Sequence, residues 1–205
     1  MKRKFIYSFG GGKADGTAGM KFILGGKGAN LAEMTNIGLA VPPGFTISTD
    51  MCHYFFDHDG KYPKDFERAT AKALAKVQKL TGKKFGDARN PLLVSVRSGS
   101  AASMPGMMDT ILNLGLNDVT IRGIIEQSGN ERFAFDSYRR LIQMYGEVVM
   151  GLKAQTENDR DPFEIIIEQK KRERGIEHDT DLTVSDLRDL VKLFQEEIRR
   201  QLGKD

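Results

Sequence analysis

The sequence predicts an α+β fold in two parts. A mixed region of small strands and helices covers residues 1–118, and a helical subdomain covers residues 119–205. Short apolar runs, partly β-branched, recur only in the first part and are typical of strands. In the second part apolar residues recur at helical spacing and no convincing strand pattern is found. The strand runs are Phe5–Phe9, Phe45–Ile47, Leu92–Val96 and Thr110–Leu114.

Length and composition exclude several classes of protein. A chain of 205 residues with 40% hydrophobic residues can form one domain or two small ones. The net charge of +3 is slight, with both signs interspersed, so no nucleic-acid partner is expected. No apolar run reaches the roughly 18 residues of a membrane span. The single cysteine, Cys52, excludes an internal disulfide and indicates a reducing compartment such as the cytosol. We expect it to be buried as a small hydrophobic residue.

The first half reads as loops, helices and strands in alternation. Gly10–Gly16 is glycine-rich and polar, as in a solvent-exposed loop. A helix is predicted from about Gly28 to Ile37, closed by a left-handed Gly38. Its expected apolar stripe is Leu31, Met34 and Ile37.

Two further helices are predicted before residue 92. Ser48 or Thr49 can cap the first of them. The second begins at Pro63 and runs to about Leu80. Its expected buried face is Phe66, Ala69, Ala73 and Val77.

In the second half two long amphipathic helices stand out. Thr183 with Asp186 forms a capping-box pattern at the start of the last helix. Lys153–Asp161 reads as a polar linker. The apolar positions at helical spacing are Phe135, Tyr138, Leu141, Ile142, Tyr145, Val148 and Val149, then Leu187, Leu190, Val191, Phe194 and Ile198.

The most informative stretch is Ser95–Asp118. The apolar, β-branched run Leu92–Val96, typical of a buried strand, leads directly into Arg97. Arg97 is followed by a loop of small residues, Ser98–Gly106. Arginine pairs two phosphate oxygens at once, and small residues let backbone N–H groups approach an anion. The pattern therefore indicates phosphate handling, although a lone arginine more commonly pairs with a carboxylate or carbonyls.

A second candidate is Gly25-Gly26-Lys27-Gly28, immediately before the predicted helix. A helix N-terminus favours phosphate, and Lys27 adds a mobile charge. It is not a Walker A loop, because Gly28 stands where Ser or Thr would be needed. On its own this string is more typical of a plain loop.

Several stretches resemble the amino-terminal part of the pyruvate, phosphate dikinases, and together they run almost from end to end. The stretches are Ile23–Met34, Val41–Thr46, Gly82–Asp87, Ser95–Asp118, Arg132–Arg140 and Asp179–Thr183. The resemblance implies an ATP-grasp-type nucleotide-binding subdomain with a small mixed sheet. It also implies interconversion of ATP, phosphate and pyruvate with AMP, pyrophosphate and phosphoenolpyruvate.

The resemblance also assigns site residues. Lys27 would contact ATP phosphates, and Arg97 would be the catalytic residue that contacts the transferred phosphates. The Mg2+ ligands, a second ATP-grasp half, a phosphohistidine domain and a pyruvate-binding barrel would lie outside this chain, and a homodimer is implied for the whole enzyme. The remaining nucleotide-binding candidates are Gly26, Gly28, Ser98, Gly99, Ser100, Ser103, Met104 and Gly106.

Other interpretations stay open at this point. Phosphoenolpyruvate synthase and the glucan-directed dikinases share this kind of ATP-binding part. A stand-alone, non-catalytic nucleotide-binding module is a second class, and a basic nucleic-acid binder is a third. His53, His58 and His178 lack the Gly-Gly-Met-Thr-Ser-His context of the phosphohistidine, so structural roles are expected for them.

Overall fold

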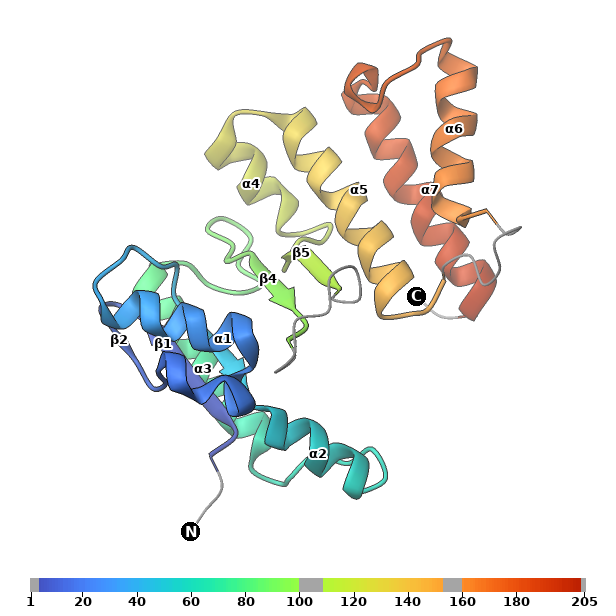
Figure 1. Ribbon diagram of the computed structural model, residues 1–205. Helices are drawn as coiled ribbons and strands as arrows, with labels where there is room; N and C mark the ends of the chain where they lie inside the picture. Colours follow the sequence, from blue (N-terminus) through green and yellow to red (C-terminus); the bar gives the residue numbers. More distant parts are fainter. Residues whose placement is uncertain (1–3, 100–108, 153–159, 204–205) are drawn as a thin grey trace. The chain divides into compact units, whose positions relative to one another are not determined.

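Figure 1 shows the helices and strands of the protein in a computed structural model, which describes residues 4–99, 109–152 and 160–203. The contacts divide the chain into two compact units. Unit 1 runs up to Lys83 and includes the segment that starts at Ser98. Unit 2 comprises Lys84–Arg97 and the chain from Asp109 onward. The strand at Thr110–Leu114 packs against a helix of unit 2.

Unit 1 is built on a three-stranded antiparallel sheet in the order β2-β1-β3. The strands are β1 (Ile6–Gly10), β2 (Lys13–Ala14) and β3 (Gly44–Ile47). Gly11 and Gly12 form the tight turn between β1 and β2 with φ of 63° and 79°, a region that glycine adopts readily. The Gly10–Gly16 segment is thus largely a hairpin.

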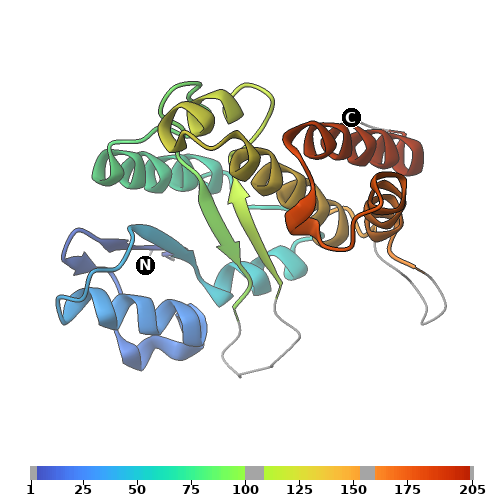
Figure 2. The same cartoon turned by 90° about the horizontal axis from the view of Figure 1, so that it is seen from above.

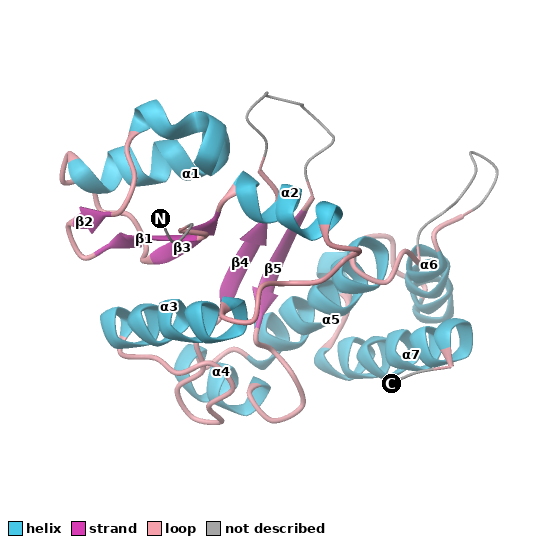
Figure 3. Cartoon of the chain, turned by 90° about the horizontal axis from the view of Figure 1, so that it is seen from below, coloured by secondary structure: helices cyan, strands magenta, loops and turns pink. Residues whose placement is uncertain are grey.

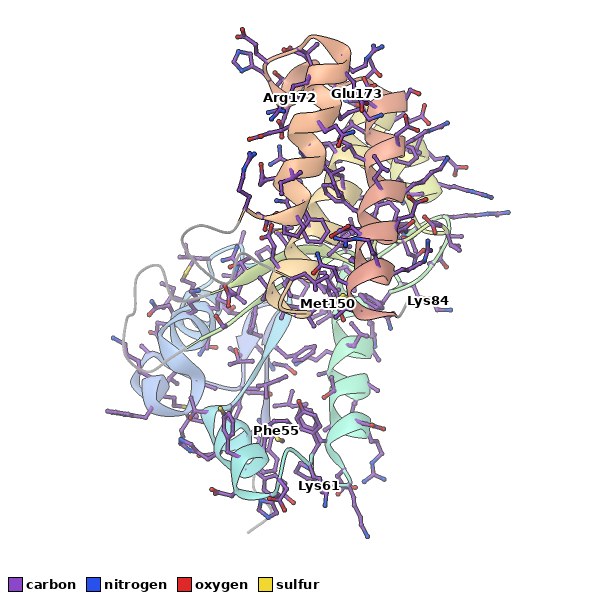
Figure 4. The ribbon with its side chains drawn as sticks, turned by 90° about the vertical axis from the view of Figure 1, so that its right-hand side faces the viewer. Phe55, Lys61, Lys84, Met150, Arg172 and Glu173 are labelled. Carbon is purple, nitrogen blue, oxygen red and sulfur yellow. The ribbon has the colours of Figure 1, made fainter. Side chains whose placement is uncertain are left out.

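Three helices surround this sheet. They are α1 (Lys21–Asn36), α2 (Thr49–Asp57) and α3 (Phe66–Thr81), with a 3-10 turn at Ala18–Met20 before α1. Helices α1 and α3 lie on opposite faces of the sheet, as Figure 2 and Figure 3 show from two sides. In Figure 4, Phe55 lies on α2 and Lys61 in the connection to α3.

Helix α1 ends as predicted but buries a different face. Gly38 has φ of +86°, and the N–H groups of Gly38 and Leu39 donate to the carbonyls of Thr35 and Met34, at 3.2 and 2.9 Å. This is the Schellman arrangement, which confirms the left-handed cap.

The predicted stripe on α1 is wrong. Met34 and Ile37 are 40% and 65% exposed, and Leu31 is only partly buried. A Cβ on Gly28 would lie 2.8 Å from Cγ2 of Thr46 on β3, so only small residues allow α1 to approach the sheet. The residues that α1 buries are Leu24, Gly25, Gly28, Ala29, Ala32 and Thr35.

The predictions for α2 and α3 are met in part. Ser48 occupies the N-cap position of α2, but its side chain makes no capping hydrogen bond with any described residue. Helix α3 buries Ala73 and Val77 as expected, whereas Ala69 is exposed. Cys52 is exposed, so its predicted burial is wrong.

Unit 2 joins a two-stranded sheet to helices. The strands β4 (Val94–Arg97) and β5 (Thr110–Leu114) are antiparallel, with Val94 opposite Leu114 and Arg97 opposite Thr110. The fold class, α+β, is confirmed, but the described strands form two small antiparallel sheets rather than one mixed sheet.

The strand before Arg97 is less buried than the apolar run predicted. Leu92 is buried, but it precedes β4, and Ser95 and Val96 within β4 are exposed. In a two-stranded ribbon one face can remain open, so an apolar run alone does not guarantee burial.

The helical second half is confirmed. It contains α4 (Ile121–Ser128), α5 (Glu131–Val148), α6 (Pro162–Arg174) and α7 (Val184–Leu202), with a 3-10 turn at Asp179–Asp181. Figure 1 shows α5 and α6 beside α7 and α4 next to α5.

The core of unit 2 lies among these helices and β5. Phe163 and Phe194 are fully buried and meet edge to face, with ring centroids 4.9 Å apart. The five apolar positions predicted for the last helix are all buried. Of those predicted for α5, Val148 and Val149 are 36% and 51% exposed, and Val149 lies just beyond the end of the helix.

Capping also follows the sequence in this unit. The backbone N–H of Thr183 donates to the Asp186 carboxylate at 3.0 Å, and the N–H of Asp186 donates to the Thr183 hydroxyl oxygen at 3.3 Å, so the capping box is confirmed. Asp161, expected in a linker, caps α6 by accepting from the N–H groups of Phe163 and Glu164. Residues 153–159 of that linker lie outside the described part.

Among the described residues, every helix is too short or too polar to cross a membrane.

Candidate functional site

Helix α1 is broken at the glycine string that the sequence singled out. Gly25 has φ of 68° and ψ of 168°, a conformation essentially restricted to glycine. Residues 21–24 form a separate helical turn before it, and a new helical segment begins at Gly26. The predicted helix start at Gly28 is therefore close to this restart, but the turn that precedes it was not foreseen.

Neighbouring elements hold both sides of this break. Before it, the Thr49 hydroxyl at the start of α2 donates to the carbonyl of Phe22 at 2.6 Å. After it, Gly28 packs directly against Thr46 of β3. Leu24, 4% exposed, lies against Gly16.

Between these anchors the chain is open. A Cβ on Gly26 would meet no atom within 4 Å among the described residues. The Lys27 side chain is exposed, and its Nζ donates to the carbonyl of Ser98 at 3.3 Å. The break therefore presents a cation and the first turn of a helix in one place, the combination that suits phosphate.

Arg97 is the last residue of β4 in unit 2. Its side chain is exposed, and Nε donates to the Ser95 hydroxyl at 3.2 Å. The next two residues, Ser98 and Gly99, are exposed as well.

The structure thus describes some of the candidate residues and not others. It brings Lys27 together with Ser98, whereas Arg97 belongs to the other unit. Ser100, Ser103, Met104 and Gly106 lie outside the described residues. Sequence reasoning missed Thr49 and the turn before Gly25, since no local pattern announces a contact between residues 27 positions apart.

The described part of the chain offers no ready metal site. It contains no group of three or more His, Cys, Asp or Glu side chains placed to hold an ion. These described residues therefore do not form an Mg2+ donor set.

The histidines have local contacts in keeping with structural roles. His58 stacks on Tyr54 with ring centroids 3.7 Å apart, and its Nδ1 lies 2.8 Å from the carbonyl of Tyr54. His178 begins the 3-10 turn before α7, and its N–H donates to Asp181.

A separate apolar pocket of about 420 Å³ lies within unit 2. Beside it the Tyr138 hydroxyl donates to Asp118 at 3.1 Å and accepts from Gln195 at 3.2 Å. Burial, together with the Asp118 charge, raises the pKa of the Tyr138 hydroxyl well above its ordinary value. The pocket is lined by Leu114, Leu116, Tyr138, Leu141, Ile142, Tyr145, Met150, Gln195, Ile198 and Arg199, and Met150 is labelled in Figure 4.

The glycine string lies within a region that matches a known protein family. Residues 21–62 match the family model described as "Pyruvate phosphate dikinase, AMP/ATP-binding domain". Over 200 residues, 98% of this chain, the sequence is 46% identical to pyruvate, phosphate dikinase of Rhizobium meliloti. It is 49% identical to that of Clostridium symbiosum over 94% of the chain. The chain is similar to the pyruvate, phosphate dikinases.

The same relationship extends to plants. Pyruvate, phosphate dikinase 1, chloroplastic, of Zea mays is 49% identical over 95% of this chain. The chain spans about a fifth of the length of these relatives, 20 to 22%. The resemblance inferred from the sequence is thereby confirmed, and the chain matches the AMP/ATP-binding part of the dikinases.

Proposed function

We propose that this chain is the ATP-binding amino-terminal part of a pyruvate, phosphate dikinase. It would bind ATP for phosphoryl transfer to a histidine outside this chain, in the interconversion of ATP, phosphate and pyruvate with AMP, pyrophosphate and phosphoenolpyruvate. The observation that carries the proposal is the AMP/ATP-binding match at residues 21–62. It contains the break in α1 and Lys27.

In this proposal the α1 break binds phosphate oxygens. The Lys27 ammonium supplies the charge, and the backbone at Gly26 and Gly28 supplies N–H groups in the first turn of a helix. Gly28 contributes through its backbone while it packs on Thr46.

Arg97 would stabilise the charge on the phosphates during transfer, the dominant requirement of this chemistry. Its guanidinium is planar and always charged, so two N–H groups can meet two oxygens. The segment that begins with Ser98 and Gly99, and includes Ser100, Ser103, Met104 and Gly106, would add backbone and hydroxyl contacts.

The rest of the reaction requires parts outside this chain. We propose that Mg2+ ligands come from a second ATP-grasp half, and that a phosphohistidine domain and a pyruvate-binding barrel complete the enzyme as a homodimer. We place it in the cytosol because a single cysteine suits a reducing compartment. No nucleic-acid or membrane partner is proposed.

The test measures the affinity of this 205-residue chain for ATP in an NMR titration that extends into the millimolar range. Lys27→Gln and Arg97→Gln should each weaken binding by about tenfold or more, because each removes a charge-assisted hydrogen bond to phosphate. Lys72→Gln and Arg122→Gln are matched controls, since both side chains are exposed in the same units, and should leave affinity unchanged.

Two outcomes would contradict the proposal. Unchanged ATP affinity in both Lys27→Gln and Arg97→Gln would remove the assigned phosphate contacts. Submicromolar affinity for the unaltered chain would show a complete nucleotide site, whereas the proposal expects weaker binding because other contacts come from outside.

A further inference from the structure

The α1 break is held from outside α1, by the segment in which β3 passes into α2. Thr46 contacts Gly28 after the break, and Thr49 hydrogen-bonds Phe22 before it. Only two residues separate these contacts in the sequence, so one short segment holds both sides of the Gly25 bend.

The two contacts differ in kind. The Gly28 contact is steric, because Cγ2 and Oγ1 of Thr46 would lie 2.8 and 2.9 Å from an added Cβ. The Phe22 contact is a directed hydrogen bond of 2.6 Å from a threonine hydroxyl. A steric contact limits how closely α1 approaches, whereas a hydrogen bond fixes the direction of the Phe22 peptide.

Between the two contacts, Gly26 and Lys27 are accessible to a ligand, whereas Leu24 and Gly25 are buried. Gly26 faces open space among the described residues, and Lys27 is exposed. Binding is strengthened when the groups that meet a ligand are already ordered, because less conformational entropy is then lost.

We propose that Thr49 is a positioning residue for the phosphate-binding turn at Lys27. It contacts no phosphate itself; its hydroxyl holds the Phe22 carbonyl and thereby sets the orientation of the Gly26–Gly28 backbone. The inference rests on the proposed ATP-binding function of that turn, and it assigns a role to a side chain outside the glycine string.

The positioning role is tested by Thr49→Val, because valine keeps the shape of the threonine side chain but lacks the hydroxyl that donates to Phe22. Thr49→Val should weaken ATP binding to the 205-residue chain by about fivefold, on the scale of one lost hydrogen bond. Thr49→Ser retains the hydroxyl and should stay within about twofold of the unaltered chain. NMR titration measures both, and amide exchange without ATP should quicken at Gly26–Gly28 in Thr49→Val only.

Thr70→Val is the matched control. The Thr70 hydroxyl donates to the carbonyl of Phe66 within its own helix, at 3.0 Å, so its loss changes hydrogen bonding without touching α1. ATP affinity should not change. A general loss of unit 1 structure would weaken binding in both valine variants, which would overturn the positioning role.

A double mutant distinguishes the positioning role of Thr49 from the phosphate contact of Lys27. In a Lys27→Gln background, Thr49→Val should still weaken ATP binding further, because the Gly26 and Gly28 N–H groups that it positions remain in place. If Lys27→Gln weakens binding but Thr49→Val does not, the positioning inference fails alone. If Lys27→Gln has no effect, the proposed function of the turn fails as well.

Discussion

The two units of this chain are stabilised in different ways. In unit 2, long helices bury large side chains such as Phe163, Phe194 and Leu190 completely. In unit 1 the compact cluster around α1 consists of Leu24, Ala29 and Ala32. Small residues bring α1 close to its sheet and leave a glycine-rich turn exposed. Unit 1 thus owes its form to close backbone packing, whereas unit 2 owes its form to side-chain burial.

The largest expected effect is on the core of unit 2. Phe194→Ala should lower its free energy of unfolding by about 3–5 kcal/mol, because a fully buried ring packed on Phe163 is lost. Leu24→Ala, in the smaller cluster of unit 1, should cost nearer to 2 kcal/mol. Amide exchange in α7 and in α1 measures the two units in turn. A larger loss from Leu24→Ala would reverse the comparison.

The next effect concerns the chemistry assigned to unit 2. In a dikinase that carries this sequence as its amino-terminal part, Arg97→Ala should slow phosphoryl transfer from ATP to the histidine by about a hundredfold. The reason is the loss of a charge-stabilising donor in the transition state. A near-normal rate of histidine phosphorylation would leave Arg97 without a role, and Arg122→Ala serves as the control.

Substitutions at two glycines of α1 test whether close packing shapes unit 1. Gly28→Ala should destabilise the unit by about 1–3 kcal/mol, because its Cβ would be forced against Thr46. Gly26→Ala should instead stabilise it by about 0.5 kcal/mol, because alanine favours helix and the site is open. Chemical denaturation compares them. Equal effects would mean that close packing does not govern α1.

The smallest effect is a pH dependence in unit 2. Burial raises the pKa of the Asp186 carboxyl, but hydrogen bonds from Thr183 and the charge of Arg174 lower it more, so the net pKa lies below its ordinary value. A lowered folded-state pKa stabilises the protein above the ordinary value and loses that contribution as pH falls through the folded value.

Unfolding of unit 2 should therefore become easier below about pH 4. Asp186→Asn should flatten this dependence while lowering stability at neutral pH. The change is measured by denaturant titration of helical circular dichroism at several pH values. An unchanged pH profile in Asp186→Asn would show that other carboxyl groups determine it.

The sequence predicted the helical unit well for a physical reason. Burial of large residues on one helix face leaves a period of 3.6 in the chain, so the positions from Leu187 to Ile198 could be read directly. The same rule failed for α1, where Met34 and Ile37 are exposed. There the buried face is made of glycine and alanine, which carry little hydrophobic signal.

For the candidate site, the sequence suggested residues but not their geometry. Gly-Gly-Lys-Gly was a candidate phosphate-binding turn before a helix, and its residues lie at a helix restart, while phosphate binding there stays a prediction. The bend at Gly25 and the bond from Thr49 to Phe22 depend on contacts distant in sequence. The apolar run Leu92–Val96 was expected to form a buried strand, but most of β4 is exposed in a two-stranded ribbon.

The most direct measurement of the central claim is amide chemical-shift mapping of this chain with ATP and, separately, with adenosine. If the α1 break binds phosphate, ATP should shift the amides of Gly26, Lys27 and Gly28, and adenosine should leave them nearly unchanged. Equal shifts with adenosine, or ATP-induced shifts confined to the helices of unit 2, would contradict the account.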